Sequence, residues 1–296
     1  MVIWSVFFII SSINKMSFMN QFKTAILLSL LTALLLWVGS FWGRSGLIIG
    51  LVFALVMNVG SYWFSDKIVL KMYKAQPVSK KDNPKLWNIV KEVCHKAKMP
   101  MPKVYIIPSD ASNAFATGRN PEHAAIACTK GIMSLLNENE LRGVIGHEIS
   151  HIKNRDILIS TIAATIAGVI SYVAMMARWG AMFGGFGRNR EGGNMIQLLV
   201  LAIITPIMAM ILQLAISRSR EYMADASSAK LLKDSSGLRS ALEKLHSDVR
   251  RNPLKFGNQA TSSLFIINPF RAGGIAKLMS THPPFEERVK RLKEMD

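Results

Sequence analysis

The chain has 296 residues, of which 50% are hydrophobic, and a formal net charge of +17. Its apolar residues are gathered in uncharged blocks, which excludes an ordinary soluble domain. On a soluble protein the positive charge would suggest nucleic acid as a partner. Here the basic residues lie beside the apolar blocks, and no basic helix with interleaved aromatic residues is present. We therefore expect a membrane protein that binds no nucleic acid.

The N-terminal segment, residues 1–23, begins with the apolar stretch MVIWSVFFIISSINK, which is too short to span a bilayer. It lacks the clear basic start and small-residue cleavage site of a signal peptide. Two interpretations stay open. Either translation starts at Met16 or Met19 and the preceding residues are an extension of the reading frame, or those residues belong to the chain.

Four longer blocks contain no charged residue, and each is about long enough to cross a ~30 Å hydrocarbon core as an α-helix. In lipid the backbone has to satisfy its own hydrogen bonds, so we expect helices, arranged as two hairpins over residues 24–64 and 157–216. The link inside the second hairpin is glycine-rich and basic, so whether this hairpin crosses the bilayer completely stays open. The four blocks are residues 24–42, 46–64, 157–177 and 195–216.

Basic residues gather outside the two hairpins. Between Asp66 and Lys103 there are ten Lys against three acidic residues, and residues 217–296 hold fifteen Lys or Arg against nine. The connection between the first two blocks holds only Arg44. Positive residues face the cytoplasm in membrane proteins, so both basic stretches are predicted to be cytosolic. Their charge also favours contact with anionic lipid headgroups of the bilayer.

Between the hairpins, residues 65–156 are predicted to form the first part of a soluble domain. The stretch NPKLWNIVKEVCHKA has apolar residues at helical spacing, with Pro84 near its start. KVYIIP, SNAFATG and HAAIAC are typical of short strands, with a turn at GRNPE. A further helix begins at Asn137, which forms a capping pair with Glu140, and we expect this helix to continue into the third apolar block.

Residues 217–296 are predicted to be mostly helical, with a break at HPPF, and to form the second part of the same domain. The predicted fold class is therefore mainly α with a small β-sheet. It combines four transmembrane helices in two hairpins with one cytosolic domain. Cys94 and Cys128 lie in no metal-type or redox-type cluster, and we expect both to be buried thiols.

The stretch HEISH, residues 147–151, carries the strongest chemical signal. Residues four apart lie on the same face of a helix, so His147 and His151 could hold one Zn²⁺. Glu148 lies beside the first histidine, where its carboxylate could act as the general base for hydrolysis. So short a pattern also arises by chance, and a catalytic zinc site needs a third protein ligand.

The third ligand is expected in the stretch SRSREYMADASS. Glu221 could bind the metal, and Asp225, four residues later, could accept a hydrogen bond from the outer ring nitrogen of either histidine. The alternative is that both acids pair with neighbouring arginines on a solvated helix. The predicted topology favours metal binding by Glu221. Two crossings by the second hairpin would return Glu221 to the membrane face at which the HEISH helix ends.

Four motifs in this order, SNAFATG, HEISH, SREYMAD and STHPPFEERVKRL, resemble the HtpX family of membrane-bound zinc endopeptidases, which are relatives of the CAAX prenyl endopeptidases. The resemblance runs from the first hairpin to the C-terminus. It implies a zincin-like protease domain with one Zn²⁺ per chain, bound by His147, His151 and Glu221, with Glu148 as the base. It further implies a multi-pass protein of the bacterial inner membrane whose active site faces the cytoplasm. Its substrates would be misfolded or surplus membrane proteins or other unfolded polypeptide, in stress response and protein quality control.

Two further places are candidates for catalysis and substrate binding. His282, in THPPFEER, could donate to the oxyanion that forms during hydrolysis, as the family's pattern supports, or could cap the helix that follows it. The stretch NAFA is typical of an edge strand, to which an extended substrate could add through backbone hydrogen bonds. Its first residue could contact the substrate or the oxyanion, or only open the strand. The four strand candidates are Asn113, Ala114, Phe115 and Ala116.

Two other functions stay open. A CAAX-type prenyl-protein endopeptidase would need more spans than four apolar blocks supply to enclose a chamber. A non-catalytic membrane protein that only binds zinc would need no base, so Glu148 between the two histidines favours an enzyme. The sequence predicts no particular oligomeric state.

Overall fold

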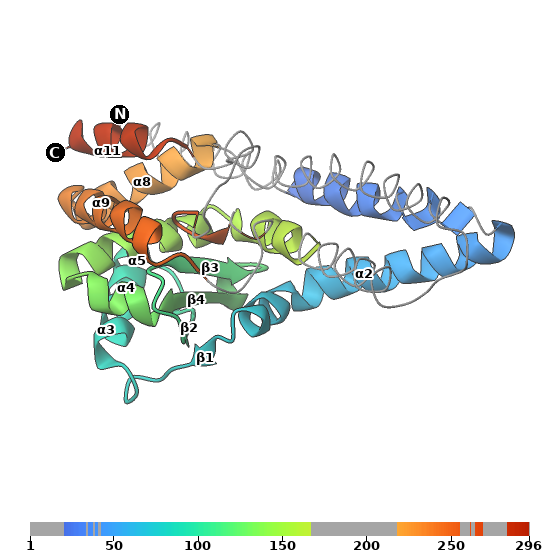
Figure 1. The fold of residues 1–296 in the computed structure, drawn as a ribbon, viewed down its shortest axis with the longest axis horizontal. Helices are drawn as coiled ribbons and strands as arrows, with labels where there is room; N and C mark the ends of the chain where they lie inside the picture. The colour runs from blue at the N-terminus through green and yellow to red at the C-terminus, as the bar shows by residue number, and fades with distance from the viewer. Residues whose placement is uncertain are drawn as a thin grey trace.

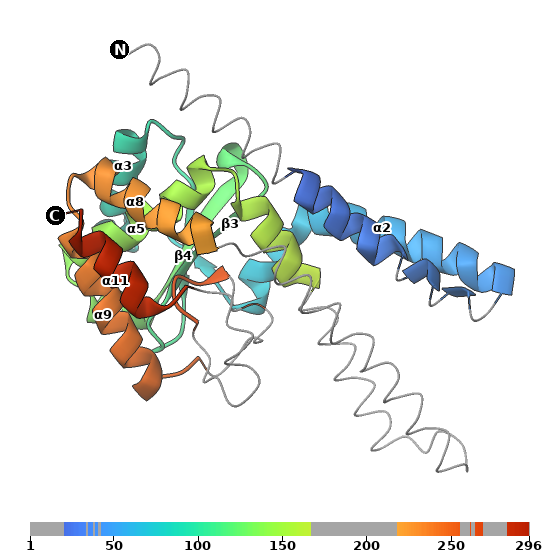
Figure 2. The same ribbon diagram turned by 90° about the horizontal axis from the view of Figure 1, so that it is seen from above.

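A computed structural model describes residues 21–33, 35–37, 39–40, 43–166, 218–254, 261, 264–268 and 283–295 of the chain. These residues are mostly helical and include one small mixed sheet, which confirms that part of the predicted fold class. A long pair of helices projects from a rounded body that holds the sheet and other helices (Figures 1 and 2). The fourth apolar block and most of the third lie outside the described residues.

The projecting pair is the first predicted hairpin. α2 (Gly43–Met72) is a 30-residue helix, longer at both ends than the predicted block. Among the described residues it is the one helix long and apolar enough to cross a membrane. The helix Gln21–Trp37, described with gaps, lies beside it in Figure 2, and Figure 1 shows the two converging toward the end far from the body.

α2 buries small residues and exposes large ones, the reverse of a helix in a water-soluble core. Ile49 is 69% exposed. A Cβ atom added at Gly50 would lie 2.7 Å from the carbonyl oxygen of Leu35, so only glycine allows the two helices to pack this closely. Asn58 Nδ2 donates to Thr32 Oγ1 at 2.8 Å across the pair. Small residues and polar pairs of this kind hold helices together in lipid. The small residues that α2 buries are Gly46, Gly50, Ala54, Ser61 and Ser65.

The helix that carries HEISH does not continue into the third apolar block, so that expectation is wrong. α5 (Glu138–Lys153) is followed by Arg155 in the left-handed conformation, with a φ of +56°, and a separate helix covers Ile157–Ile166. On one continuous helix, residues five apart would lie on different faces. The break instead turns the Asp156 carboxylate back toward His151, so that Asp156 Oδ2 lies 3.1 Å from His151 Nδ1.

The three predicted strands are confirmed, and a short fourth strand, β1, joins them without a clear signal in the sequence. The strand order is β1-β2-β4-β3, with β2 and β4 parallel and the other two pairs antiparallel. The predicted turn contains a short 3₁₀ helix, Pro121–His123. β3 lies at one edge of the sheet, as predicted for NAFA. The strands are β1 (Gln76–Pro77), β2 (Lys103–Ile107), β3 (Ala114–Gly118) and β4 (Ala124–Thr129).

The sheet lies between two apolar layers because side chains alternate along each strand. On one face, Ile126 packs with α3 (Pro84–Ala97) and with α5. On the other face, Phe115 packs against Tyr73, just beyond the end of α2, and against Phe265, with ring centroids 5.7 and 5.3 Å away. The sheet therefore connects the foot of the projecting helix pair to the helix that carries HEISH.

The helices α8, α9 and α11, which follow residues 157–216 in the chain, pack onto the same body. α8 and α9 both contact α5, and α11 contacts α8 and α9 (Figure 2). Ser228 Oγ of α8 donates to the carbonyl oxygen of Gly143 in α5 at 2.9 Å. Residues before 157 and after 217 thus meet in one core. The remaining helices are α4 (Lys130–Leu135), α8 (Arg218–Leu232), α9 (Ser236–Arg251) and α11 (Phe285–Lys293).

Candidate metal centre

The predicted capping pair is present at the start of α5. Asn137 Oδ1 accepts from the amide of Glu140, and Glu140 Oε2 accepts from the amide of Asn137, both at 2.9 Å. These bonds satisfy two of the amides that the start of a helix leaves unpaired. From this start, His147 and His151 lie one turn apart, where α5 meets α8 and its Glu221.

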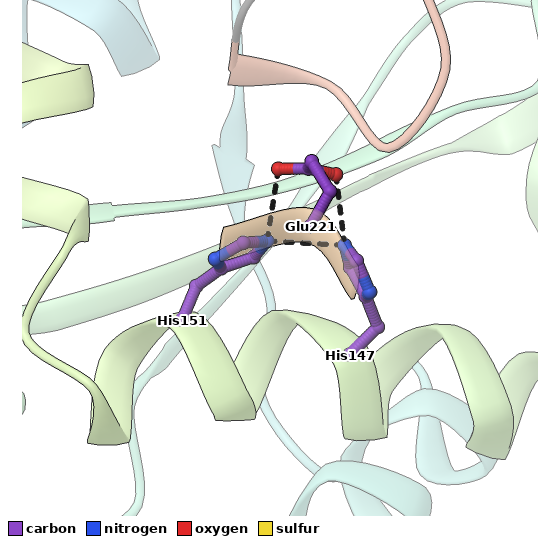
Figure 3. A group of neighbouring side chains, drawn as sticks. All are labelled: His147, His151 and Glu221. Carbon is purple, nitrogen blue, oxygen red and sulfur yellow. Dashed lines mark hydrogen bonds and ion pairs between the residues drawn. The ribbon is translucent and has the colours of Figure 1, made fainter. Parts of the chain in front are cut away.

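The structure brings His147, His151 and Glu221 together (Figure 3). The Nε2 atoms of the two histidines are 3.0 Å apart. Glu221 faces both rings, with Oε2 at 3.6 Å from His147 Nε2 and Oε1 at 3.5 Å from His151 Nε2. One potential ligand atom from each residue lies within 4.8 Å of the others, so the cluster could hold a single metal ion.

Each histidine presents its other ring nitrogen to a carboxylate. His147 Nδ1 lies 2.8 Å from Oδ1 of Asp225, and His151 Nδ1 lies 3.1 Å from Oδ2 of Asp156. An ionised carboxylate only accepts, so each Nδ1 carries a proton, and each Nε2 can bind a cation once it has lost its own proton. At 3.0 Å the two Nε2 atoms are close enough to share one cation. Two imidazole nitrogens and one carboxylate oxygen are also the donor set of many catalytic zinc sites.

The sequence did not indicate Arg288 of α11 as part of this centre. Its Nε and Nη2 donate to the two carboxylate oxygens of Asp225 at 2.8 and 2.7 Å, and Nη1 donates to the carbonyl oxygen of Ile266 at 2.8 Å. A signal was available, because Arg288 shares the buried face of α11 with Leu292, four residues later. An arginine on a buried helix face predicts a buried acidic partner.

The buried carboxylates around the cluster outnumber the buried guanidinium groups. Four carboxylates stand against two guanidinium groups, and all six residues are at most 8% exposed. When all six are ionised, two negative charges remain and need compensation. Without a metal it comes from protons on the two rings, because, against the effect of burial, the neighbouring carboxylates raise the pKa of His147 and raise that of His151 to about 10. A divalent cation in the cluster would supply the same compensation. The residues are Glu148, Asp156, Glu221 and Asp225, with Arg220 and Arg288.

The two glutamates of the site differ in protonation. Burial raises the pKa of Glu148 to about 7. Burial also acts to raise the pKa of Glu221, but the nearby His147 and the positive charges of His151 and Arg288 outweigh it and hold that pKa well below its usual range. Glu221 is therefore ionised and able to bind a cation. Glu148 exchanges a proton near neutral pH, which suits a general base.

A cavity of about 30 Å³ lies beside the cluster. Its lining includes both histidines, Glu148, Ala116 of β3 and residues 264–266. The backbone amide of Ala116 hydrogen-bonds to the Glu148 carboxylate and so directs it. A cavity of this size admits an ion or a water molecule but no peptide.

The outer edge of β3 is engaged by the chain's own residues 264–268. The amide of Ile266 donates to the carbonyl oxygen of Ala114 at 3.2 Å. Asn113 Nδ2 donates to the carbonyl oxygen of Ile267 at 2.7 Å, and Asn113 Oδ1 accepts from the amide of Ala114 at 3.1 Å. Asn113 and Ala114 therefore hold residues 264–268 against the sheet.

The remaining sequence candidates lie in different places. Ala116 lines the cavity, whereas Phe115 packs on the opposite face of the sheet. His282 lies outside the described residues. The helix α11 begins three residues after it, and Arg288 in that helix has Nη1 at 3.8 Å from Oε2 of Glu221.

The chain is similar to known peptidases. The profile of peptidase family M48 matches residues 80–296. A protease HtpX homolog of Syntrophobacter fumaroxidans is 54% identical over 281 residues, which cover 93% of this chain and 99% of the relative. One of Pyrococcus furiosus is 50% identical over 274 residues, covering 92% and 95%. The crystal structure of S. mikatae Ste24p matches with 20% identity and a TM-score of 0.49, over 94% of this chain and 66% of that chain. The chain therefore belongs to peptidase family M48, as its resemblance to the HtpX proteases predicted.

Proposed function

We propose that the chain is a zinc-dependent endopeptidase of the cell membrane that cleaves misfolded or surplus membrane proteins and other unfolded polypeptide at the cytosolic face. Family membership makes it a metalloprotease. The proposed zinc-dependent mechanism is supported by the cluster of His147, His151 and Glu221, with Glu148 and a cavity beside it. The zinc, the cellular location and the substrates are the proposed part.

One zinc ion per chain would be held by His147, His151 and Glu221. Asp225 and Asp156 orient the two rings so that both Nε2 lone pairs point at the cluster. A zinc ion bound there would supply Lewis acidity, which polarises the scissile carbonyl and makes water easier to deprotonate. The two excess negative charges among the buried groups support a divalent ion over a monovalent one.

Glu148 is proposed as the general base. It takes the proton from the attacking water and passes it to the leaving amine, and the amide of Ala116 holds its carboxylate toward the cavity. His282 is proposed to donate a hydrogen bond to the oxyanion. The connectivity of the chain supports this role for His282. The helix α11 begins three residues after it, and Arg288 of that helix has Nη1 at 3.8 Å from Glu221 Oε2.

Substrate is proposed to add to the edge of β3 as an extended strand. The carbonyl of Ala114 and the side chain of Asn113 now bind residues 266 and 267, and they are the groups that an incoming strand would use. The segment 264–268 therefore has to leave this edge before a peptide reaches Glu148. Pairing through backbone groups requires little of the substrate sequence, which suits unfolded polypeptide.

Residues 65–156 and 217–296 are proposed to form one cytosolic protease domain, carried by the membrane hairpins 24–64 and 157–216, with residues 1–23 preceding them. The packing of α8, α9 and α11 onto the α5 side supports the single domain. The large exposed side chains of α2 support contact with lipid. The basic residues outside the hairpins support a multi-pass protein of a bacterial inner membrane with its site in the cytoplasm.

The test is metal analysis and casein cleavage by detergent-purified wild type, Glu148→Gln and Glu221→Ala. We expect about one zinc per wild-type chain, and zinc retention with a loss of activity of about 10²- to 10⁴-fold in Glu148→Gln. Glu221→Ala should lose zinc. Glu138→Gln, the same substitution at an exposed position in the first turn of α5, is the control. Cleavage by Glu148→Gln at the wild-type rate would refute the mechanism.

The same samples separate the alternative functions. Cleavage confined to prenylated peptides would indicate a CAAX-type prenyl endopeptidase. Zinc retention without cleavage of casein or of prenylated peptide would indicate a non-catalytic zinc-binding protein. We expect cleavage of unmodified casein, because the edge of β3 offers backbone groups that any extended peptide could pair with.

A further inference from the structure

Arg288 of α11 is a buried cation, 2% exposed, that lies close to three residues of the site. It donates to both carboxylate oxygens of Asp225 on α8, at 2.8 and 2.7 Å. It also donates to the carbonyl oxygen of Ile266 at 2.8 Å and lies 3.8 Å from Glu221. One side chain therefore joins the last helix, the helix that carries the third candidate ligand, and the segment that lines the cavity.

The contact with Asp225 leads directly to the metal cluster. Oδ1 of Asp225 accepts from Arg288 Nη2 at 2.7 Å and faces Nδ1 of His147 at 2.8 Å. A carboxylate held by one bond can rotate, whereas a bidentate guanidinium fixes the plane of both oxygens. The direction of the His147 ring, and with it the lone pair on Nε2, thus depends on Arg288.

The position requires a guanidinium and not merely a positive charge. A lysine amine is a point charge on a flexible chain, and it does not present parallel donors to two oxygens in one plane. Here a third donor of the same plane binds the Ile266 carbonyl, so the docking of residues 264–268 and the orientation of Asp225 share one group.

We propose that Arg288 is a positioning residue of the metal centre, which sets zinc affinity through Asp225 and His147. This inference rests on the proposed zinc site. It differs from a purely structural ion pair between α8 and α11, which would stabilise the fold without changing how tightly the metal binds.

A double-mutant cycle on zinc affinity separates the two roles. Dissociation constants for Zn²⁺ are measured by competition with a chromophoric chelator, using detergent-purified wild type, Arg288→Lys, Asp225→Asn and the double variant. We expect Arg288→Lys to weaken zinc binding about 10- to 100-fold in the wild-type background, the usual effect of removing a ligand's supporting group. In the Asp225→Asn background the same change should have little effect, because its path to the metal is already lost.

Arg291→Gln is the matched control. Arg291 lies on the same helix, stacks 3.9 Å from the ring of Tyr222 on α8 and pairs with Glu287 at 2.7 Å, so it supports the same helix contact without touching Asp225. We expect its zinc affinity to stay at the wild-type value. The visible absorption of bound Co²⁺ adds a spectroscopic readout, which should change in Arg288→Lys and not in Arg291→Gln.

Three results would overturn the proposal: unchanged zinc affinity in Arg288→Lys, an equal loss in both backgrounds, or an equal loss in Arg291→Gln. Thermal unfolding of the metal-free protein shows whether each variant folds. If Arg288→Lys does not fold, the uncharged double variant Asp225→Asn/Arg288→Gln is compared with Asp225→Asn. Equal zinc affinities then support the path through Asp225, and a further tenfold loss overturns it.

The outcomes also distinguish this proposal from the proposed function. A wild-type protein that binds no zinc overturns both. If the wild type binds zinc, Glu148→Gln is inactive and Arg288→Lys binds zinc as tightly as the wild type, only the role of Arg288 is overturned.

Discussion

Glu140 stabilises two helices at once through a single buried carboxylate. Besides capping α5, it accepts from Ser240 Oγ at 2.6 Å and from Lys244 Nζ at 2.8 Å, both on α9. Burial acts to raise its pKa, but the bonds from Lys244 and Ser240, with the amide of Asn137, outweigh burial and lower the pKa. A carboxyl group with a lowered pKa in the folded state stabilises that state only while it is ionised.

We expect Glu140→Gln to lower the free energy of unfolding by about 1 kcal/mol at pH 7, because the amide keeps the helix cap and loses the charged bond to Lys244. The contribution of the carboxylate is present above its unfolded pKa and is lost as the pH falls through the lowered folded pKa. Thermal unfolding, with a chelator in both samples, should therefore show the variant and the wild type converging below the ordinary glutamate range. A difference that persists unchanged into strong acid would contradict this.

At the residue scale, sequence spacing could predict groups whose partners lie within one helix turn. His147 and His151 follow from a spacing of four, and the capping pair follows from a spacing of three, because the helix itself fixes these distances. Arg288 could not be found this way. Its partner, Asp225, lies 63 residues earlier in the chain, and their meeting depends on how α11 packs across α8.

The contact between α5 and its two neighbouring helices depends on two glycines one turn apart, at Gly143 and Gly146. A Cβ atom at Gly143 would lie 2.6 Å from the backbone nitrogen of Leu238 in α9. A Cβ atom at Gly146 would overlap the Ser228 hydroxyl of α8. Overpacking of a buried contact typically costs about 1–3 kcal/mol. The two helices differ in one respect, since α8 carries Glu221 and α9 carries none of the three candidate ligands.

We therefore expect Gly143→Ala and Gly146→Ala to lower the unfolding temperature alike, but only Gly146→Ala to weaken zinc binding, by about tenfold or more, because it displaces the helix of a ligand. Thermal unfolding and chelator competition measure the two effects. Gly60→Ala is the control, because a Cβ atom at Gly60 of α2 meets no atom within 4 Å. Equal zinc affinity in Gly143→Ala and Gly146→Ala would show that the spacing between α5 and α8 does not set the site.

The edge of β3 offers a prediction about binding. If a substrate strand replaces residues 264–268, Asn113 Nδ2 exchanges the carbonyl of Ile267 for one of the peptide. An interaction made equally in the bound substrate and in the transition state changes KM and not kcat. Because the free enzyme makes the equivalent bond to Ile267, the two losses largely cancel, and we expect Asn113→Ala to leave kcat for casein unchanged and to confine any effect to KM. A fall in kcat with KM unchanged would instead place Asn113 at the oxyanion.

Element type was predictable where periodicity and turn residues agreed, as in β2, β3, β4 and α3. Two features were not. β1 is two residues long and exists because it pairs with β2, so no local pattern announces it. The break after α5 was hidden because apolar residues follow it, and a left-handed Arg155 leaves no sequence signal comparable to a glycine.

At the scale of the whole molecule, the packing of α8 onto α5 restricts the membrane topology. Both helices lie in one body, so the chain between them has to cross the bilayer an even number of times, or not at all. The far end of the first hairpin, at Arg44, should lie on the opposite side, because α2 is long enough to cross once. Arg44 is exposed there. Exposed residues at three places, namely Arg44, the chain before α3, and α8, can therefore be used to test the orientation.

The test uses cysteine substitutions at exposed residues and a membrane-impermeant maleimide. The two native thiols should not react, because Cys94 and Cys128 are buried and burial raises the pKa of Cys94 to about 12. We expect Arg44→Cys to be labelled in intact cells, and Lys80→Cys and Lys230→Cys only after permeabilisation.

The two cytosolic positions carry separate information. Lys80 precedes α3 and Lys230 lies on α8, so they flank the second hairpin. If both are labelled in intact cells, the site faces outward and the proposed orientation is wrong, although the metal centre still stands. If only one of them is labelled, an odd number of crossings separates HEISH from Glu221, and the two cannot share a metal ion. Equal behaviour of Lys80→Cys and Lys230→Cys is therefore what a metal centre built from both halves of the chain requires.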